Sequence, residues 1–201
     1  GDNNSAFGYN ALVYNTTGAN NVSVGYGTLF SNVVGINNTS VGYLALYSNT
    51  TSNSSAFGYK SLYTNTIGGF NSAFGNYALH LNTTGGYNSA FGYQSLKANT
   101  IGINNSAFGY RSLYANTTGA YNSAFGRSAL KYNTIGRFNV AIGDESLNKN
   151  TTGNKNTAVG RATLLNNTIG SSNSAFGMYA LLYNTCLLYT SDAADEGLGV
   201  D

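Results

Sequence analysis

The feature that most constrains this chain is a 17-residue repeat that runs through almost its whole length. One glycine recurs in every unit, at Gly8, Gly25, Gly42, Gly58, Gly75, Gly92, Gly109, Gly126, Gly143, Gly160 and Gly177, and one step, from Gly42 to Gly58, has 16 residues. Such a unit is too short for a helical hairpin and suits one turn of a β-solenoid. The sequence therefore predicts an all-β fold, a β-solenoid or β-roll of eleven coils about 50 Å long.

Two more columns of the repeat never vary. Leucine stands four residues after each glycine, as at Leu79, Leu96 and Leu113, and asparagine stands three residues further on, as at Asn82, Asn99 and Asn116. We expect the leucines in the core and the asparagines at turns, with their amides hydrogen-bonded along the rod; a ligand role for the asparagines is the alternative. The segment between glycine and asparagine fits a bend, or a short helical turn ended by a left-handed asparagine, in each coil.

The segment before each glycine, Asn-Ser-Ala-Phe in most units, is typical of a short strand whose residues alternate between two faces. We expect Phe74 and its equivalents inside, because a ladder of large apolar groups is costly to expose. The small residues would then form a smooth outer lane for assembly, at Ala56, Ala73, Ala90, Ala107, Ala124 and Ala141. The alternative places alanine and glycine in the coil's own narrow interior, with phenylalanine facing a partner subunit.

The composition indicates that the chain is not an enzyme and carries no cofactor. Charged residues make up 8% of the chain, and His80 is the only histidine. Asp144 and Glu145 are neighbours that suit a solvated turn better than an acid–base pair. One cysteine excludes an internal disulfide and a cysteine zinc site. The nine basic residues fall at many columns, which predicts no charged stripe and no nucleic-acid site. No apolar run is long enough to span a membrane.

Two rows of polar side chains could bind a ligand at the surface. Tyrosine follows the constant glycine at Tyr9, Tyr26, Tyr43, Tyr59, Tyr93 and Tyr110, and this row could grip glycans. The alternative is that these tyrosines only cover a corner of the coil. Threonine follows the constant asparagine in ten of the eleven units, an array that could face ice. The next column alternates between threonine and isoleucine, so a second rank of threonines is incomplete. We expect the side chains of this Thr/Ile column to point inward in every coil.

The composition changes abruptly at Cys186. The sequence Cys-Leu-Leu-Tyr-Thr-Ser-Asp-Ala-Ala-Asp-Glu that starts there resembles the translated end of a DNA-sequencing adapter. We therefore predict a single repetitive solenoid over 1–185, a fragment open at both ends, and a disordered, non-native tail over 186–201.

The repeat unit also resembles known families. Its Asn-Ser-Ala-Phe-Gly and Asn-Thr-Ala-Val-Gly segments resemble the head repeats of trimeric autotransporter adhesins, and the pattern NTAxGxxALxxNTTG resembles repeats of bacteriophage tail fibres and bacterial surface proteins. The resemblance covers 1–185 and implies a β-roll or β-solenoid, often trimeric, that holds a receptor-binding tip away from a surface. The adhesin repeat is shorter than 17 residues, so its coil geometry does not carry over.

These observations predict a structural and adhesive segment of an extracellular, cell-surface or virion fibre. Its expected partner is itself, as a trimer or fibre, through the Ala/Gly lane or by end-to-end stacking. The alternative is a binding module that presents its tyrosine row to glycans or its threonine row to ice.

Overall fold

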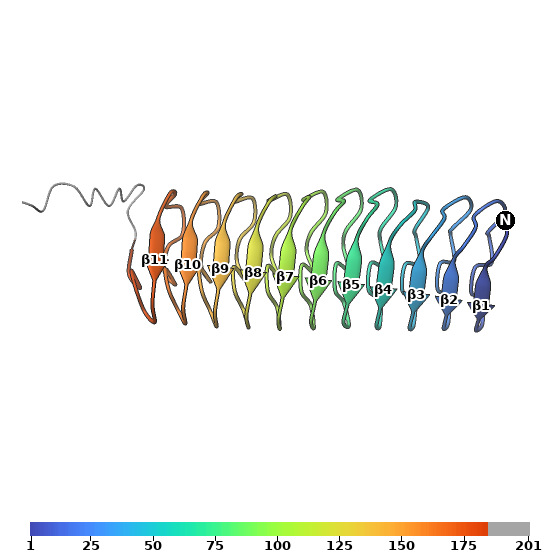
Figure 1. The fold of residues 1–201 in the computed structure, drawn as a ribbon, viewed down its shortest axis with the longest axis horizontal. Coiled ribbons are helices and arrows are strands. Elements are labelled where there is room, and N and C mark those ends of the chain that lie inside the picture. The colour runs from blue at the N-terminus through green and yellow to red at the C-terminus, as the bar shows by residue number, and fades with distance from the viewer. Residues whose placement is uncertain (185–201) are drawn as a thin grey trace, which may run out of the picture.

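The computed structural model describes residues 1–184, which form one rod of stacked coils (Figure 1). Each coil carries one three-residue strand, and the strands pair in parallel with their sequence neighbours into an eleven-stranded sheet. The strands are β1 (Ser5–Phe7), β2 (Val22–Val24), β3 (Thr39–Val41), β4 (Ser55–Phe57), β5 (Ser72–Phe74), β6 (Ser89–Phe91), β7 (Ser106–Phe108), β8 (Ser123–Phe125), β9 (Val140–Ile142), β10 (Thr157–Val159) and β11 (Ser174–Phe176).

The predicted all-β solenoid is confirmed. Helical turns, the alternative for the bends, do not occur within 1–184. The tail predicted over 186–201 lies outside the described residues. Below, each coil is named by its strand.

The strands pair in register, so residues of one column lie above one another along the rod. Ala73 pairs with Ala90 and Phe74 with Phe91. Backbone hydrogen bonds run in both directions between neighbouring coils; the Gly92 N–H donates to the Phe74 carbonyl at 2.8 Å. Every sequence column therefore becomes a ladder parallel to the rod axis, and the chemistry of a column decides the chemistry of a whole surface line.

The core is a narrow stack of leucine and alanine. The constant leucines from Leu29 to Leu164 have no exposed surface, and the alanines of the strands lie against them. Burying one leucine side chain contributes roughly 1.5–3 kcal/mol. Because each coil has only a few such groups, the core becomes sizeable only when coils are stacked.

The strands face the opposite way to the main expectation. The alanines predicted to form an outer assembly lane have an exposed fraction of 0%: Ala56, Ala73, Ala90, Ala107, Ala124 and Ala141. The phenylalanine column is on the outside, and partly exposed Phe74 is typical of it. The lane prediction is therefore wrong, because leucine and two asparagine columns fill the narrow interior and leave room for little more than a methyl group. The Thr/Ile column, also expected to point inward, is exposed, with Ile67 67% accessible.

The bends between glycine and asparagine place a leucine in the left-handed region. Leu79 and Leu96 both have φ of 49°, and the other constant leucines lie close to this value. The backbone of Leu79 donates to Ser95 of the next coil at 3.0 Å and accepts from Asn82 of its own coil at 3.1 Å. A left-handed residue with a side chain costs about 1–2 kcal/mol. Burial of the leucine offsets this cost. The left-handed residues of the bend are therefore the leucine and the residue two positions before it, such as Tyr77 with φ of 59°, where the sequence suggested asparagine.

Two asparagine columns run through the interior. In the column after leucine, Asn82 Nδ2 donates to Asn65 Oδ1 of the previous coil at 2.7 Å. In a second column, four residues before the constant glycine, Asn88 Nδ2 donates to Asn71 Oδ1 at 3.2 Å. Within one coil both columns converge on an inward carbonyl: Asn71 Nδ2 and Asn82 Nδ2 each lie 2.8 Å from the Gly85 oxygen. The buried amides are thereby paired along the rod, as buried polar groups require.

The carbonyl that both asparagines reach belongs to a second glycine column, and close packing requires glycine there. A Cβ on Gly119 would lie 2.5 Å from the Gly136 oxygen and 2.9 Å from Asn133 Nδ2. Any side chain would push two coils apart and displace an amide of the ladder.

The 16-residue coil, that of β3, interrupts both asparagine columns. The Thr51 carbonyl stands where other coils have glycine, and it accepts from Asn38 and Asn49, each at 2.8 Å. Asn32 Oδ1 is buried and accepts no hydrogen bond within 1–184. In the next coil Ser54 replaces the asparagine of the second column. The fold therefore tolerates a missing residue at the cost of one step in each amide ladder.

Candidate functional site

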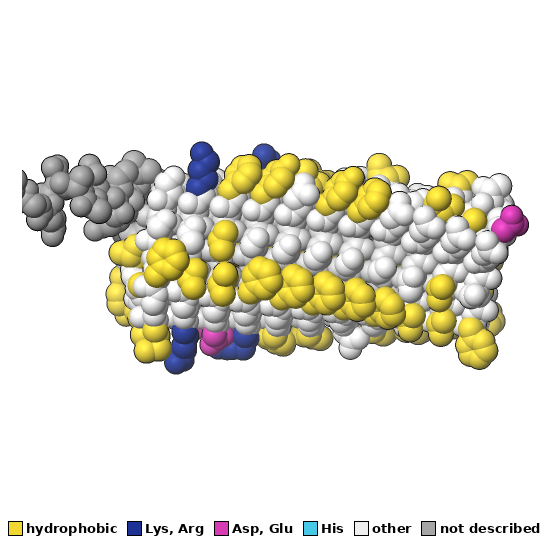
Figure 2. Space-filling model, in the orientation of Figure 1, with side chains coloured by type: hydrophobic (Ala, Val, Ile, Leu, Met, Phe, Trp, Pro, Cys, Tyr) yellow, Lys and Arg dark blue, Asp and Glu magenta, His cyan; other side chains and the backbone are white. Residues whose placement is uncertain are grey.

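The most prominent outer feature is a row of stacked phenylalanines on the strand face. Neighbouring rings lie 4.6–4.9 Å apart between centroids and are nearly parallel, through Phe57, Phe74, Phe91, Phe108 and Phe125. Val24, Val41, Ile142, Val159 and Phe176 extend the same column. Figure 2 shows a continuous row of hydrophobic side chains along the strand-bearing face. We call this row, from Phe7 to Phe176, the phenylalanine ladder.

The strand face around this ladder carries no charge. From four residues before the constant glycine to the glycine itself, none of the eleven coils contains a charged residue. If each side chain of the ladder exposes roughly 60–80 Å², the ladder presents on the order of 700 Å² of apolar surface. A standard interface takes about 800 Å² from each partner. The face thus has the size and chemistry of a contact surface, and the charged side chains gather at the rod's edges (Figure 2).

The predicted tyrosine row is exposed on one edge of the rod. Tyr9, Tyr26, Tyr43 and Tyr59 form one stack with centroid distances of 5.1–5.3 Å. Tyr93 and Tyr110 form a second stack at 5.5 Å, beyond the coil in which Asn76 replaces the tyrosine. All six rings are at least 37% exposed. Neighbouring rings partly cover one another's faces, so the row presents mainly ring edges and hydroxyls.

A hollow of about 270 Å³ opens in this edge where Gly27 supplies no side chain. Its wall consists of aromatic rings from two columns, with Asn10 and Leu44 among its other lining residues: Tyr26, Tyr43, Phe30, Tyr47 and Tyr63. Rings with hydroxyl groups suit a ligand that is apolar on one side and polar on the other. Sequence analysis missed this hollow, although Gly27 is the only glycine two positions after the constant glycine.

The threonine side chains of this row form hydrogen bonds to the backbone of the next coil. Thr83 Oγ1 donates to the Thr100 carbonyl of the next coil at 3.1 Å, and Thr100 and Thr117 repeat the contact. The Thr100 carbonyl also accepts the backbone N–H groups of Thr83, Thr84 and Gly85 at 2.9–3.3 Å. The hydroxyl protons of these three threonines are therefore used within the rod, and ice binding stays a prediction.

His80 is half-buried in an aromatic column and makes a structural contact. Its ring stacks on Tyr63 at 5.5 Å between centroids, and Nδ1 lies 3.0 Å from the Lys60 carbonyl. Burial is the main reason why the pKa of His80 is lowered, and the charges of Lys97 and Lys60 act in the same direction. The neutral ring thus continues the column that Phe30, Tyr47 and Tyr63 begin.

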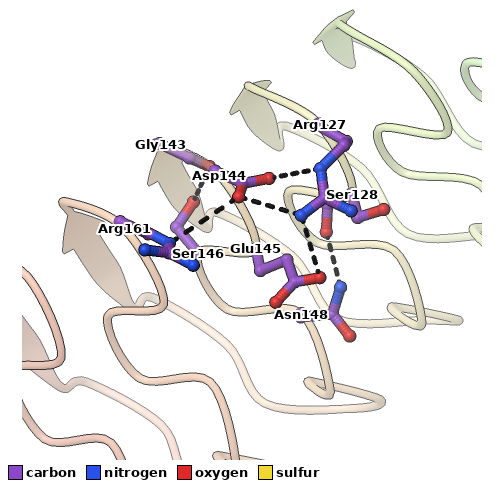
Figure 3. A network of polar contacts seen from close by, with 8 residues as sticks. All are labelled: Arg127, Ser128, Gly143, Asp144, Glu145, Ser146, Asn148 and Arg161. Carbon is purple, nitrogen blue, oxygen red and sulfur yellow. Dashed lines mark hydrogen bonds and ion pairs between the residues drawn. The ribbon is translucent and has the colours of Figure 1, made fainter.

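The acidic pair forms a surface cluster with arginine (Figure 3). Arg127 Nε lies 2.8 Å from Asp144 Oδ1, and Arg127 Nη2 lies 3.3 Å from Glu145 Oε1. Arg161 approaches Asp144 from the other side at 3.9 Å. The hydrogen bond to Asp144 is the main reason why the pKa of Arg127 is raised. These groups are solvated, so the cluster is a surface ion pair of small energetic weight.

The basic residues do form a stripe, contrary to the sequence-based prediction. Seven of the nine lie between the constant glycine and the constant asparagine of their coil: Lys60, Lys97, Arg111, Arg127, Lys131, Lys149 and Arg161. The bend brings these columns together, since Arg111 lies over the rings of both Tyr110 and Tyr114. Taken column by column, the basic residues look scattered. Taken together as all positions of one bend, they form a cluster.

Residues 1–184 contain no group of three or more His, Cys, Asp or Glu side chains placed to hold a metal ion. They also contain no helix long and apolar enough to cross a membrane. Comparison with protein-family models, with curated proteins and with solved structures finds no match for this chain. Its surfaces are therefore interpreted from their own chemistry.

Proposed function

We propose that the chain is a structural and adhesive rod, a segment of an extracellular, cell-surface or virion fibre, that associates side by side with copies of itself. The observation that carries the proposal is the uncharged strand face with its exposed phenylalanine ladder. Exposed apolar patches of this size usually mark contact sites. The resemblance of the repeat to those of tail fibres and surface proteins supports the same function.

The flat geometry of the ladder suits a second rod. Its rings recur at every coil along β4 to β8, so two rods that share the same spacing can match along their length. Lateral contact would remove most of the exposed apolar surface from water, at roughly 25 cal/mol per Å². The partner face is thus the phenylalanine ladder, in place of the buried alanine column.

The test is the solution mass of the full chain, measured by sedimentation and light scattering over a range of concentrations. The variant carries Phe74→Thr, Phe91→Thr and Phe108→Thr; threonine has the shape of the valines already present in this column, so the coil should stay folded. We expect discrete oligomers or fibres for the parent chain and a monomer for the variant.

The matched control replaces three rings of the edge, Tyr43→Asn, Tyr93→Asn and Tyr110→Asn, because Asn76 already occupies that column. This variant should assemble like the parent chain. A parent chain that stays monomeric at about 100 μM, a concentration at which even micromolar contacts form, would overturn lateral assembly. Loss of assembly in the tyrosine variant alone would move the interface to the edge.

A second candidate function, binding of uncharged glycans, is favoured by the hollow at Gly27. The variant Gly27→Lys should fill this hollow, because Lys60 holds the same column position with φ of 51°. The new Cβ would lie 2.6 Å from Leu44 Cδ2, so the end of the Leu44 side chain must turn aside. The chain has no tryptophan, so its tyrosine fluorescence can report binding of neutral hexose oligosaccharides. Binding should disappear in Gly27→Lys, and equal binding by both proteins would reject the hollow as the site.

A further inference from the structure

The bend edge of the rod carries a block of positive charge that no acidic residue interrupts. The edge comprises the residues between the constant glycine and the constant asparagine of each coil. From the coil of β4 to that of β8 it holds five cations: Lys60, Lys97, Arg111, Arg127 and Lys131. No acidic residue occurs anywhere between Asp2 and Asp144. Of these five cations, only Arg127, at the far end of the block, makes an ion pair within 1–184. We call this block the cationic edge.

Aromatic rings of the edge hold several of these cations. Lys60 Nζ lies 5.3 Å from the Tyr59 centroid and 5.5 Å from that of Tyr63. Lys97 Nζ lies between Tyr77 and Tyr114, at 5.6 and 5.7 Å. Cation–π contacts orient an ammonium group without cancelling its charge. The cations are therefore positioned on the surface and still available to an anion.

Arg111 and Lys131 continue the same pattern. The Arg111 guanidinium carbon lies 5.2 Å from the Tyr110 centroid, and Arg111 Nε donates to Gln94 Oε1 at 2.8 Å. Lys131 Nζ lies 4.6 Å from the Tyr132 centroid and donates to its hydroxyl at 3.1 Å. The remaining donors of the guanidinium and ammonium groups can reach an external acceptor.

The fixed spacing of the coils selects a long, repeating anion. Coils lie about 4.8 Å apart, so the cationic edge extends over about 20 Å, with cations one or two coils apart along it. A small anion would use one of these groups, whereas a linear polymer with negative charges roughly 5–10 Å apart would use several at once.

The rings favour sugar over nucleic acid as the body of that polymer. Binding of single strands depends on bases stacking on open aromatic faces. On this edge, Tyr93 and Tyr110 partly cover one another, with planes 14° apart. What they present is mainly hydroxyls and ring edges, which suit the hydroxyl groups of a saccharide.

We propose that the cationic edge binds a linear acidic polysaccharide, a chain of sugars bearing carboxylate or sulfate groups. This ligand class differs from the neutral glycan considered above. The two sites meet at Tyr63, which lines the Gly27 hollow and lies beside Lys60. The site also lies off the strand face, so it does not depend on lateral assembly and a bound chain would leave the phenylalanine ladder free.

The test measures binding of the full chain to three probes by interferometry: a polyuronate oligosaccharide, neutral dextran of equal length and single-stranded DNA. The variant carries Lys60→Gln, Lys97→Gln and Arg111→Gln, with Gln94 showing that the edge accepts glutamine. We expect the polyuronate to bind, the dextran not to bind, and the variant to lose at least tenfold in affinity. Raising the salt from 50 to 200 mM should weaken parent binding about tenfold or more, as released counterions predict.

The matched control removes charge outside the bend edge, with Arg137→Gln and Lys155→Gln, and is compared with the double variant Lys97→Gln, Arg111→Gln. It should bind polyuronate within about twofold of the parent chain if counterion release comes mainly from the edge. Equal losses in both double variants would show attraction by net charge alone and overturn the site. Absence of polyuronate binding at low salt would overturn the proposal, and so would tighter, variant-sensitive binding of the DNA.

Discussion

The coils of β3 and β4 and the coils of β5 to β10 share one backbone plan but differ in how their interiors are joined. Among the regular coils both asparagine columns are continuous; Asn116, for example, donates to Asn99 at 2.8 Å and accepts from Asn133 at 2.9 Å. At the shortened coil Asn32 Oδ1 has no donor within 1–184, and Asn71 N–H reaches Ser54 Oγ at a long 3.4 Å.

The outer ladders do not break at the same step. Tyr43 stacks on Tyr59 at 5.3 Å and Tyr47 on Tyr63 at 5.4 Å, across the junction where the interior columns fail. Strand pairing also continues in register from β3 to β4. The difference teaches that strand pairing and ring stacking keep the coils aligned, while the amide columns add stability wherever the spacing is regular.

The largest effect should come from breaking a continuous column. Asn116→Ala removes three side-chain hydrogen bonds and leaves their buried partner atoms without this contact. We therefore expect the free energy of unfolding to fall by about 3 kcal/mol. Asn49→Ala, beside the interruption, removes two hydrogen bonds, and we expect a loss of about 2 kcal/mol. Urea unfolding followed by circular dichroism measures both. Equal losses would mean that column continuity contributes nothing.

Repairing the interruption should stabilise the rod. Inserting glycine between Thr51 and Ser52, together with Ser54→Asn, recreates the regular Asn-Thr-Thr-Gly sequence and supplies both missing amide contacts. We expect a gain of about 2 kcal/mol, and slower amide exchange in the coils of β3 and β4. Inserting alanine at the same place is the control, because the inward glycine column has no room for a Cβ; a similar gain there would contradict the packing argument.

Weakening the outer ladder at the interruption should have a smaller effect. Tyr63→Leu, a residue the same column holds at Leu165, removes the ring between Tyr47 and His80. A stacked aromatic pair adds about 0.5–1.5 kcal/mol beyond its buried area, so we expect a loss of about 1 kcal/mol by urea unfolding. Tyr114→Leu, within the regular coils, serves for comparison and should cost less, because continuous amide columns support that coil.

The smallest expected effect concerns His80, whose ring stacks on Tyr63 of the β4 coil. Its folded-state pKa is lowered from 6.5, so the unfolded chain takes up the proton first as the pH falls. Stability should be unaffected above about pH 7 and should decline through 6.5 until the folded pKa is reached. His80→Tyr, which extends the ring column, should remove this pH dependence. A decline of the same size in that variant would assign it to other groups.

The repeat itself predicted the eleven coils, the buried leucines and the stacked amides, because a column that never varies must serve a constant environment. The faces of the strand could not be deduced from alternation, which is symmetric with respect to inside and outside. A usable signal was present: the Ala/Ser column is constant in size, whereas the neighbouring column varies among Phe, Val and Ile. Only a column of constant volume can line an interior of constant width.

Other features depended on the path of the chain in three dimensions. The second asparagine column was not singled out as structural, although it fails only at Ser54. The cationic edge arises because the left-handed leucine, such as Leu113 with φ of 49°, folds several columns onto one edge. Composition could count these charges but could not place them together.

Because the coils from β5 to β10 offer their neighbours the same amides, carbonyls and strand edges, the joint between two of them does not depend on which two meet. A duplication or loss of one of these regular repeats in the gene would therefore leave the joints intact. Duplication of a coil beyond β8 would lengthen the rod by one step of about 4.8 Å and leave the Gly27 hollow, which lies among the coils of β1 to β4, unaltered. The length of the rod and the binding chemistry of its surfaces can thus change independently of one another.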